Sequence, residues 1–416
     1  MLVTPEYPPD TVGGLGTHVV ELTNGLVSDG CQVTVLAPTT QPAATQQEAS
    51  LQVHLISVPR EGYMPWVADV NRGFIGRGRS LVEGAGRRPD LIHCHDWHGF
   101  PAASQLGREY RIPVMGTVHL LNHPLCERWG VSVPDELIRQ ESALCREADA
   151  LITVSHSMRE IIRQTYGVHD HKIHVVYNGF DPEPFTQSTL TPEELLRLRR
   201  TVAAPDEKIV IFAGRIDPQK GIFPLMASAS EVVRQYPRVR YLGVGAPDES
   251  PDWNPSLLAE RFQALFPQYA HLLSRVVFTG KVPRERLAQL YQIADLAVVP
   301  SIYEPFGYAA VEAMAAGVPV VATAVGGLAE IVLDGRTGLL VPVHAGSAGP
   351  ASVDVEKLTA AQLRLLSDER MAGEFGEAGR QRVRDEFTLE RMIRLTRQAY
   401  LALLSDYASA SNARRQ

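Results

Sequence analysis

The sequence is poor in several features that would place it outside the soluble globular proteins. It has four cysteines, scattered along the chain: Cys31, Cys94, Cys126 and Cys145. They form no CxxC pair, which argues against a disulfide framework and predicts reduced thiols in the cytoplasm. No run of about 18 uncharged apolar residues occurs, so no membrane-spanning helix is expected. The formal net charge of −7 argues against nucleic acid or an anionic membrane surface as the main partner.

Length and composition indicate more than one domain. The 416 residues exceed the size at which a single hydrophobic core usually stops growing, so two domains are expected. The composition, 45% hydrophobic and 21% charged, is ordinary for a globular protein. The first ten residues, MLVTPEYPPD, contain neither a basic nor a long apolar segment, so no signal peptide is expected.

Short β-branched runs alternate with amphipathic helical patterns in the first part of the chain. A helical pattern covers residues 17–30 and is closed by Gly30. Strands are expected at 2–5, 31–38, 51–58, 90–95, 112–118, 150–155 and 173–178. This alternation, with strands that are apolar throughout, indicates an α/β fold with a parallel sheet covered on both faces.

The pattern breaks over residues 181–207, which are polar, contain several prolines and are interpreted as a linker with one surface helix. A second block then begins, and a last helix is expected near 388–405. The strands of this block are expected at 208–215, 239–245, 275–280, 295–300 and 318–323. Two such blocks predict two doubly wound domains, at 1–180 and 200–385, with one large sheet as the alternative.

In each block, a glycine-containing loop follows the first strand, at the end of the strand where open α/β sheets bind their ligands. Gly13, Gly14 and Gly16 form a turn that opens the first helix and would expose its amides to an anion. The turn matches neither GxGxxG nor a P-loop, and a plain strand-to-helix turn explains it equally well. In AGRIDPQKG (213–221), Arg215 and Lys220 precede the next helix. Two cations at a helix N-terminus predict an anion site, with a solvated surface turn as the alternative.

A third motif is SIYEPFGYAAVEAMAAGVPVVATAVGG, residues 301–327. It predicts a helix at 307–316, with Glu304 at its N-terminus and Glu312 inside its alanine-rich interior. Burial of an unpaired carboxylate costs several kcal/mol or shifts its pKa, and a ligand with hydroxyl donors would relieve that cost. A structural ion pair or a partly exposed helix face is the alternative for Glu312.

Together, these motifs resemble those of retaining glycosyltransferases of the GT-B fold, the family that includes glycogen and starch synthases. The most specific parts are the E-x7-E motif from Glu304 to Glu312 and the R-x4-K motif from Arg215 to Lys220. The resemblance covers nearly the whole chain. It implies two Rossmann-like domains facing a central cleft, and a C-terminal helix at 386–406 that crosses back to the N-terminal domain.

The resemblance also implies roles in binding a nucleotide-sugar donor. Arg215 and Lys220 would bind its diphosphate and stabilise the leaving group. Glu304 would accept hydrogen bonds from sugar hydroxyls, and Glu312 would hold the ribose. Further donor contacts would come from Gly13, Gly14, Leu15, Gly16, Phe306, Gly307, Gly326 and Gly327.

Two histidine-containing segments, HCHDWH (93–98) and GTVHLLNH (116–123), complete the resemblance. They would place His119 against the donor sugar and Asp96 near the acceptor side. His93 and His95 share one strand face, but no carboxylate or cysteine trio completes a tetrahedral zinc site, and no DxD motif occurs. We therefore expect neither a metal nor a cofactor, since the nucleotide sugar is a substrate.

The same segments are more similar to glycogen and starch synthases than to lipid-linked mannosyltransferases. This favours glucose as the hexose, ADP-glucose or UDP-glucose as the donor, and elongation of an α-1,4-glucan. Thr11 stands where those synthases commonly carry lysine, which leaves open a small-molecule, natural-product or exopolysaccharide acceptor. Two further functions fit the same architecture, a UDP-sugar epimerase and a binding protein without turnover.

Overall fold

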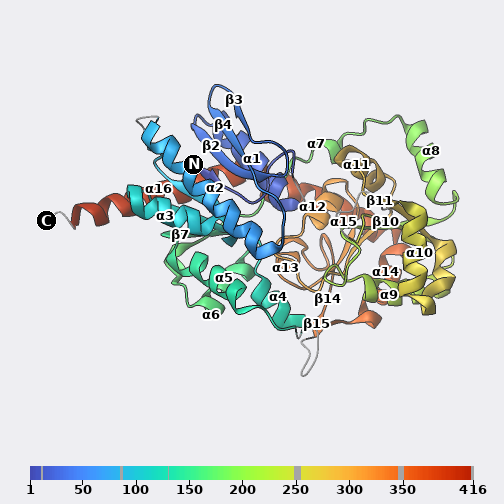
Figure 1. Cartoon of the computed structure of the whole chain (residues 1–416). Coiled ribbons are helices and arrows are strands. Elements are labelled where there is room, and N and C mark those ends of the chain that lie inside the picture. The colour runs from blue at the N-terminus through green and yellow to red at the C-terminus, as the bar shows by residue number, and fades with distance from the viewer. Residues whose placement is uncertain (11–12, 85–87, 130, 248–253, 345–350, 414–416) are drawn as a thin grey trace. The chain divides into compact units, whose positions relative to one another are not determined.

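The computed structural model describes residues 1–10, 13–84, 88–129, 131–247, 254–344 and 351–413. The chain divides into two compact units, and each is described by itself. Unit 1 comprises Met1–Gly179 and Leu389–Gln416, and unit 2 comprises Phe180–Thr388. Each unit contains a twisted sheet with helices packed against it (Figure 1).

The described part of unit 1 contains an eight-stranded sheet in the order β3-β4-β2-β1-β5-β6-β7-β8. The strands are β1 (Leu2–Val3), β2 (Val33–Thr39), β3 (Ala44–Gln47), β4 (Leu51–Ser57), β5 (Ile92–His95), β6 (Val114–Val118), β7 (Ala150–Thr153) and β8 (Ile173–Val175). All seven strands predicted from the sequence form, and they pair in parallel. The additional strand β3 is an exposed antiparallel edge strand, and its polar sequence carries no apolar signal.

The α-helices of unit 1 pack against its sheet. Within the described residues they are α1 (Gly14–Ser28), α2 (Tyr63–Gly84), α3 (Phe100–Tyr110), α4 (Asn122–Trp129), α5 (Asp135–Glu147), α6 (His156–Tyr166) and α16 (Leu389–Ala413). The C-terminal helix α16 belongs to this unit because its apolar side chains share a core with those of α1, a core that includes Met392 and Ile393 of α16 and Leu22 and Leu26 of α1. The two helices approach closely at Gly25, where a Cβ atom would lie 2.3 Å from Ile393 Cδ1.

The described part of unit 2 contains a six-stranded parallel sheet in the order β11-β10-β9-β12-β13-β14. Its strands are β9 (Lys208–Ala213), β10 (Val239–Val244), β11 (Val276–Gly280), β12 (Leu296–Val299), β13 (Val320–Thr323) and β14 (Gly338–Val341), and β15 (Val343–His344) pairs with β16 (Ser352–Val353). Its helices are α7 (Glu183–Thr186), α8 (Pro192–Val202), α9 (Ile222–Gln235), α10 (Pro255–Leu265), α11 (Arg284–Gln292), α12 (Tyr308–Ala315), α13 (Leu328–Ile331), α14 (Val355–Ser367) and α15 (Glu369–Glu386). The segment 181–207, interpreted as a linker with one surface helix, contains that helix as α8 and a further short helix, α7, and both belong to this unit.

Both sheets have a point at which the strand order reverses direction. In unit 1, β1 lies between β2 and β5, and in unit 2, β9 lies between β10 and β12. Ligand crevices of open α/β sheets form at the carboxyl ends of the strands at such a point. The loops after β1 and β5, and those after β9 and β12, therefore begin where a ligand site is expected. Among the described helices, none combines the length and the apolar character needed to cross a membrane.

Candidate active site

The loops that follow β9 and β12 meet at the reversal point of unit 2. The main-chain N–H of Ile302 donates to the carbonyl oxygen of Gln219 at 2.8 Å. The ammonium group of Lys220 pairs with the Glu304 carboxylate, with 2.6 Å between Nζ and Oε2, and Ser301 Oγ donates to the same oxygen at 3.2 Å. The fold thus joins the R-x4-K motif and the E-x7-E motif through an ion pair between residues 84 positions apart.

Glycines make this close approach of the loops possible. Gly221, the N-cap of α9, has φ of +78°, and a Cβ atom there would lie 1.9 Å from the carbonyl oxygen of Pro300. Gly326 has φ of +49°, and its Cβ atom would lie 2.0 Å from the carbonyl oxygen of Glu304. The N–H of Gly327 donates to that same oxygen at 2.9 Å. Only glycine fits positions 221 and 326 without strain, because they combine a left-handed backbone with backbone contact.

Phe306 and Gly307 form the start of α12 in the same group of loops. The Phe306 side chain is buried, and its carbonyl oxygen lies against Gly327, where a Cβ atom would approach to 2.2 Å. Gly307 caps the helix with φ of +126° and packs against Leu328. The predicted residues 304, 306, 307, 326 and 327 therefore lie together, and Lys220 contacts them through Glu304.

Arg215 lies in the loop after β9, but its guanidinium group contacts neither glutamate of the E-x7-E motif. Its Nε lies 2.9 Å from Asp217 Oδ2, and it donates to Gln219 Oε1 at 3.0 Å. The Asp217 carboxylate also accepts the N–H of Lys220 at 2.8 Å, so it orders the whole loop. The Arg215 side chain is 51% exposed, which leaves room for an anion to bind it.

Glu312 lies one helical turn into α12. The residue retains some exposed surface, but its carboxyl group is enclosed by protein, and this burial raises its pKa to about 7 against the opposing positive charges of Arg284 and Lys220. The hydroxyl of Tyr291, on α11, lies 3.4 Å from Glu312 Oε2 and 3.2 Å from the carbonyl oxygen of Ala309. Nothing in the sequence pattern identified Tyr291 as this partner.

The glycine motif of unit 1 differs from its predicted form. Gly13 is the N-cap of α1 in an extended conformation, whereas Gly14 and Gly16 lie within the first turn of the helix. Leu15 packs against the core of the unit. The N–H of Gly13 donates to a Glu6 carboxylate oxygen at 3.3 Å, so a carboxylate already occupies one amide of this helix end. Thr11 lies outside the described residues.

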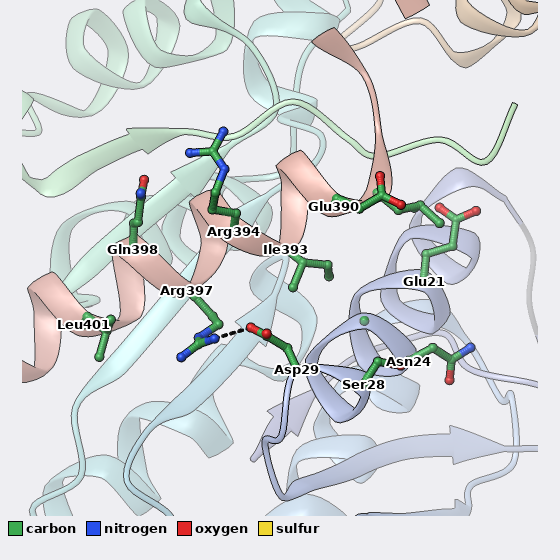
Figure 2. Close-up of a pocket in the computed structure, with 12 residues that line it drawn as sticks. Glu21, Asn24, Ser28, Asp29, Glu390, Ile393, Arg394, Arg397, Gln398 and Leu401 are labelled. Carbon is green, nitrogen blue, oxygen red and sulfur yellow. Dashed lines mark hydrogen bonds and ion pairs between the residues drawn. The ribbon is translucent and has the colours of Figure 1, made fainter. Parts of the chain in front are cut away.

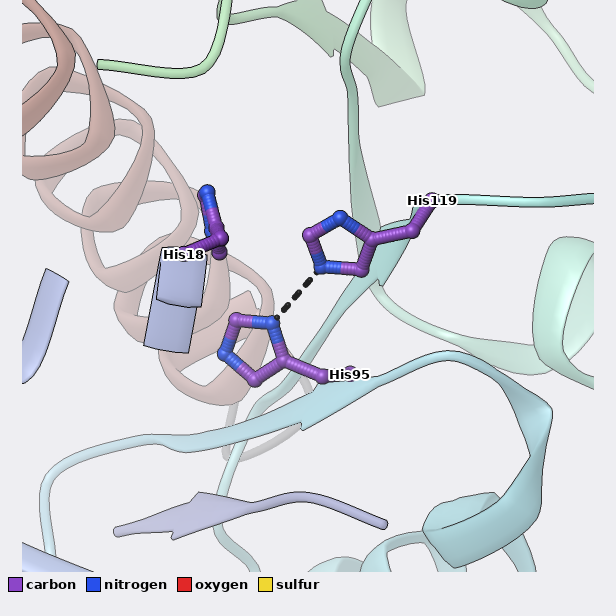
Figure 3. A group of neighbouring side chains, drawn as sticks. All are labelled: His18, His95 and His119. Atoms are coloured by element: carbon purple, nitrogen blue, oxygen red, sulfur yellow. Dashed lines mark hydrogen bonds between the residues drawn. The ribbon is translucent and has the colours of Figure 1, made fainter. Parts of the chain in front are cut away.

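His119 belongs to a group of histidines at the carboxyl ends of β5 and β6. Its Nε2 lies 3.1 Å from Nδ1 of His95, and the ring of His18, on α1, lies 4.6 Å from the His119 ring (Figure 3). Each of the three offers a nitrogen within 4.8 Å of the others, a spacing that could hold a metal ion. The rings of His93 and His95 lie 4.3 Å apart and are tilted by 36°, and His93 contacts Thr117 Oγ1 and the hydroxyl of Tyr400, both at 2.6 Å.

Burial keeps these histidines neutral. It lowers the pKa of His18 to about 4 and the pKa values of His93, His95 and His119 well below their ordinary range. Within the described chain, His18 Nδ1 and His95 Nε2 have no hydrogen-bond partner. A neutral imidazole can either bind a metal or take part in a hydrogen-bonded network, so the metal-free site stays a prediction.

Asp96 follows β5 and contacts the backbone of the His119 segment. Its Oδ1 accepts the N–H of His119 at 2.7 Å and the N–H of Leu120 at 3.4 Å. Asp96 has φ of +54°, an unusual conformation for a residue other than glycine. Burial raises the pKa of its carboxyl group to about 7, although the two amides favour the charged form. The structure thus brings the predicted residues Asp96 and His119 together through one oxygen of the carboxylate.

A second buried carboxylate, Glu141 on α5, holds the next part of this segment. It accepts the main-chain N–H of Asn122 at 2.6 Å, the side-chain amide of Asn122 at 3.0 Å and the N–H of His123 at 3.1 Å. The hydroxyl of Tyr166 donates to it at 2.9 Å. Its side chain is fully buried. Sequence reasoning missed Glu141, because an acidic residue in a charged amphipathic helix gives no sign of burial.

A groove between α1 and α16 lies on unit 1 and contains none of the predicted site residues. Its volume is about 760 Å³, and both of its walls are helical. An ion pair between Arg397 and Asp29 crosses it, and Ile393 lines its floor (Figure 2). The groove carries charges of both signs but no aromatic residue, and we assign no role to it.

The two sheet units, the joined R-x4-K and E-x7-E motifs and the histidine segment define a two-domain α/β transferase of the Rossmann-like type. Comparisons with known proteins agree. The profile described as Glycosyltransferase Family 4 matches residues 12–184, and the profile described as Glycosyl transferases group 1 matches residues 197–382. The chain belongs to the GT-B glycosyltransferases of the glycogen and starch synthase-like family, and it is an enzyme that transfers sugar.

Curated relatives carry several more specific names. The chain is 32% identical to a glycogen synthase of Mycobacterium tuberculosis over 97% of this chain and 94% of the relative. It is 31% identical to an alpha-maltose-1-phosphate synthase of Mycolicibacterium smegmatis, over 96% and 98%. It is 30% identical to a D-inositol 3-phosphate glycosyltransferase of Nocardia farcinica, over 88% and 83%.

Solved structures show the same fold. The sucrose-phosphate synthase of Thermosynechococcus elongatus superposes with a TM-score of 0.77 at 26% identity, covering 98% of this chain and all of that chain. The Anabaena protein HepE in complex with UDP and glucose gives a TM-score of 0.71 at 19% identity, covering 97% of this chain and all of that chain. At that identity the likeness concerns the fold alone.

Proposed function

We propose that the enzyme is a retaining hexosyltransferase that moves glucose from a nucleoside-diphosphate sugar to a hydroxyl group of an acceptor. The observation that carries this proposal is the ion pair between Lys220 and Glu304 at the reversal point of the unit 2 sheet. The ammonium group that would bind the diphosphate lies 2.6 Å from the carboxylate that would bind sugar hydroxyls. In a nucleotide sugar, the diphosphate and the sugar are likewise neighbours, joined by the bond that the reaction breaks. Arg215 adds an exposed guanidinium group in the same loop.

The proposed chemistry follows from where charge develops. Cleavage of the bond between the anomeric carbon and the phosphate oxygen leaves negative charge on the departing diphosphate. Lys220 and Arg215 stabilise that charge, and fixed donors of this kind contribute about 2–4 kcal/mol each to lowering a barrier. The acceptor oxygen forms the new bond to the anomeric carbon, and its proton passes to the leaving phosphate. Retention by front-face attack is adopted from the resemblance to the family, since no carboxylate stands out as a nucleophile.

The leading donor is ADP-glucose or UDP-glucose, and the leading acceptor is an α-1,4-glucan. The 32% identity to a glycogen synthase supports the glucan. Relatives named alpha-maltose-1-phosphate synthase and D-inositol 3-phosphate glycosyltransferase support a second candidate, transfer to a small phosphorylated acceptor. We also propose that neither reaction needs a metal and that the protein works in the cytoplasm, which its four free cysteines support.

A panel of nucleotide sugars tests the proposal. Purified protein is incubated with ADP-glucose, UDP-glucose or UDP-GlcNAc, each with glycogen, maltose, glucose 1-phosphate or no acceptor. Release of nucleoside diphosphate is the readout, and NMR of the product reports the anomeric configuration. We expect acceptor-dependent release from a glucose donor and an α-linked product. Conversion of UDP-GlcNAc without acceptor would instead indicate an epimerase, and an inverted product would contradict retention.

A further inference from the structure

Three histidines of unit 1 bring their ring nitrogens together at the carboxyl ends of β5 and β6 (Figure 3). His95 is the last residue of β5, His119 directly follows β6, and His18 lies in the second turn of α1. Each ring offers one nitrogen within 4.8 Å of the other two. His18 and His95 are buried, whereas His119 keeps some exposed surface. The fold therefore builds a group of three nitrogens from three separate elements.

The three rings have few hydrogen bonds to lose to a ligand. Nδ1 of His95 and Nε2 of His119 lie 3.1 Å apart, so only one of these two atoms can carry a proton. Nδ1 of His18 has no hydrogen-bond partner in the part of the chain that the structure describes. A buried polar atom without a partner is costly, and an ion that takes up its lone pair removes that cost. Burial also lowers the pKa values of all three rings and so keeps them neutral, which is the form that binds metals.

The distances suit a transition-metal ion. Zinc binds imidazole nitrogens at about 2.0–2.1 Å in a tetrahedron, which separates neighbouring ligand atoms by about 3.4 Å. The pair of His95 and His119 already has nearly this separation, at 3.1 Å. The nitrogen of His18 lies within 4.8 Å of both, so a movement of about 1–2 Å completes the set. Imidazole favours ions such as zinc, copper and nickel over magnesium and calcium, which prefer oxygen ligands.

We propose that His18, His95 and His119 bind a divalent ion of the zinc type, and that the bound ion inhibits the enzyme. The ion would occupy Nε2 of His119, the residue that we expect beside the donor sugar, and would tie its ring to α1. The main-chain N–H of His119 already donates to Asp96 Oδ1 at 2.7 Å, so both the backbone and the ring of this residue would then be fixed. The metal site does not depend on the proposed function, whereas the inhibition rests on it, and the sugar transfer itself stays free of metal.

Titration with Co²⁺ tests the site without an enzyme assay, on tag-free protein that has been treated with EDTA and dialysed. Cobalt held by three imidazoles absorbs visible light far more strongly than the hydrated ion, and Zn²⁺ should displace it at one equivalent per chain. His18→Ala and His119→Ala should each weaken binding by at least about 100-fold, since loss of a mere outer-shell partner costs roughly 10- to 100-fold. Because position 119 is partly exposed, His119→Ala remains a test if His18→Ala does not fold.

His171→Ala is the matched control. His169 and His171 form an exposed stacked pair, with ring centroids 5.7 Å apart, just before β8. Because β8 runs parallel to β7, this pair lies at the opposite edge of the sheet from the carboxyl ends of β5 and β6. His171→Ala should therefore bind Co²⁺ and Zn²⁺ as the wild type does.

The inhibition is measured as release of nucleoside diphosphate from the glucose donor at rising Zn²⁺ concentrations. Turnover of the wild type and of His171→Ala should fall as Zn²⁺ saturates the site, and EDTA should restore it. His18→Ala, compared with its own metal-free rate, should need at least about 100-fold more Zn²⁺ for half-inhibition.

The outcomes separate this inference from the proposed function. Absence of Co²⁺ binding to the wild type, unweakened binding in the folded variants of His18 and His119, or loss of binding in His171→Ala overturns the metal site. Full turnover by the zinc-loaded enzyme overturns the inhibition alone. Failure of the metal-free wild type to release nucleoside diphosphate from any glucose donor overturns the proposed function, and the cobalt titration still decides the metal site.

Discussion

Removal of the Glu141 carboxylate should destabilise the segment that carries His119 and reduce turnover. Four hydrogen bonds reach this carboxylate, from Asn122 N, Asn122 Nδ2, His123 N and the Tyr166 hydroxyl, at 2.6 to 3.1 Å. Hydrogen bonds to a charged group contribute about 1.5–3 kcal/mol each, but they share one acceptor and do not add. Glu141→Ala removes the acceptor that all four donors share in the interior of the unit, and we expect a loss of about 4–5 kcal/mol.

Two milder variants grade the effect. Tyr166→Phe removes one donor and leaves the carboxylate with the other three, for a loss of about 1–1.5 kcal/mol. Glu141→Gln keeps the shape but turns an amide N–H₂ toward a backbone donor, so an intermediate loss of about 2–3 kcal/mol is expected. We expect Glu141 to act as a positioning residue through the His119 segment, and misplacement of a group near the reacting atoms by about 1 Å can cost 100-fold in rate.

Urea unfolding and hydrogen exchange measure these effects. Exchange should accelerate in peptides that cover residues 119–123 in both Glu141 variants and stay near wild type in Tyr166→Phe. In a His119→Ala background, Glu141→Gln should have little further effect on turnover, because the group that it positions is already gone. Unfolding of Glu141→Ala within 1 kcal/mol of the wild type, or fully additive losses of turnover in the double variant, would refute the reasoning.

Three further predictions follow, two on residues of unit 2 and one on whether the enzyme needs a metal ion. Gly326→Ala should lower turnover strongly, because its Cβ atom would lie 2.0 Å from the Glu304 carbonyl oxygen; wild-type kinetics would show that the loop adjusts. Because the pKa of Glu312 is raised to about 7 from an ordinary 4.5, the folded state keeps a proton that the unfolded state loses, and stability falls as pH rises through that window. The Tm of Glu312→Gln minus the Tm of the wild type should therefore be larger at pH 8 than at pH 5. An equal difference at the two pH values would contradict this. Prolonged treatment with EDTA should leave turnover unchanged, and restoration of lost activity by zinc would show that the histidine group holds a metal.

The sequence predicted all but two strands of the two main sheets because buried parallel strands are apolar throughout, and it missed β14, a short run between a glycine turn and a proline. It did not predict β3, an edge strand whose four residues are all exposed and so need no apolar side chains. It also gave little sign of the long helix α2, since glycines inside a helix normally lower its stability. In the fold, Gly78 allows the helix to pack closely, because a Cβ atom there would lie 2.4 Å from Leu106.

The candidate site shows the same division between local and long-range information. The motif residues could be found from their spacing along the chain, and Glu304 and Lys220 do pair. Their partners could not be found in this way. Within unit 2, Tyr291 reaches Glu312 only through the order of strands and helices in space, and within unit 1 the same holds for Glu141 and His18 beside the His119 segment. A tyrosine, a glutamate or a histidine in an amphipathic helix has the same local sequence pattern whether its side chain faces solvent or a polar group in the interior.

The most direct test of the account is the turnover of Lys220→Ala with the glucose donor that the wild-type enzyme uses. Removal of one fixed cation should raise the barrier by about 2–4 kcal/mol, a loss of roughly 30- to 1,000-fold in kcat, in a protein whose circular dichroism and Tm show that it is folded. Leu401→Ala serves as the folded, active comparison. Turnover of Lys220→Ala close to the wild-type rate would contradict the claim that this ammonium group stabilises a departing diphosphate.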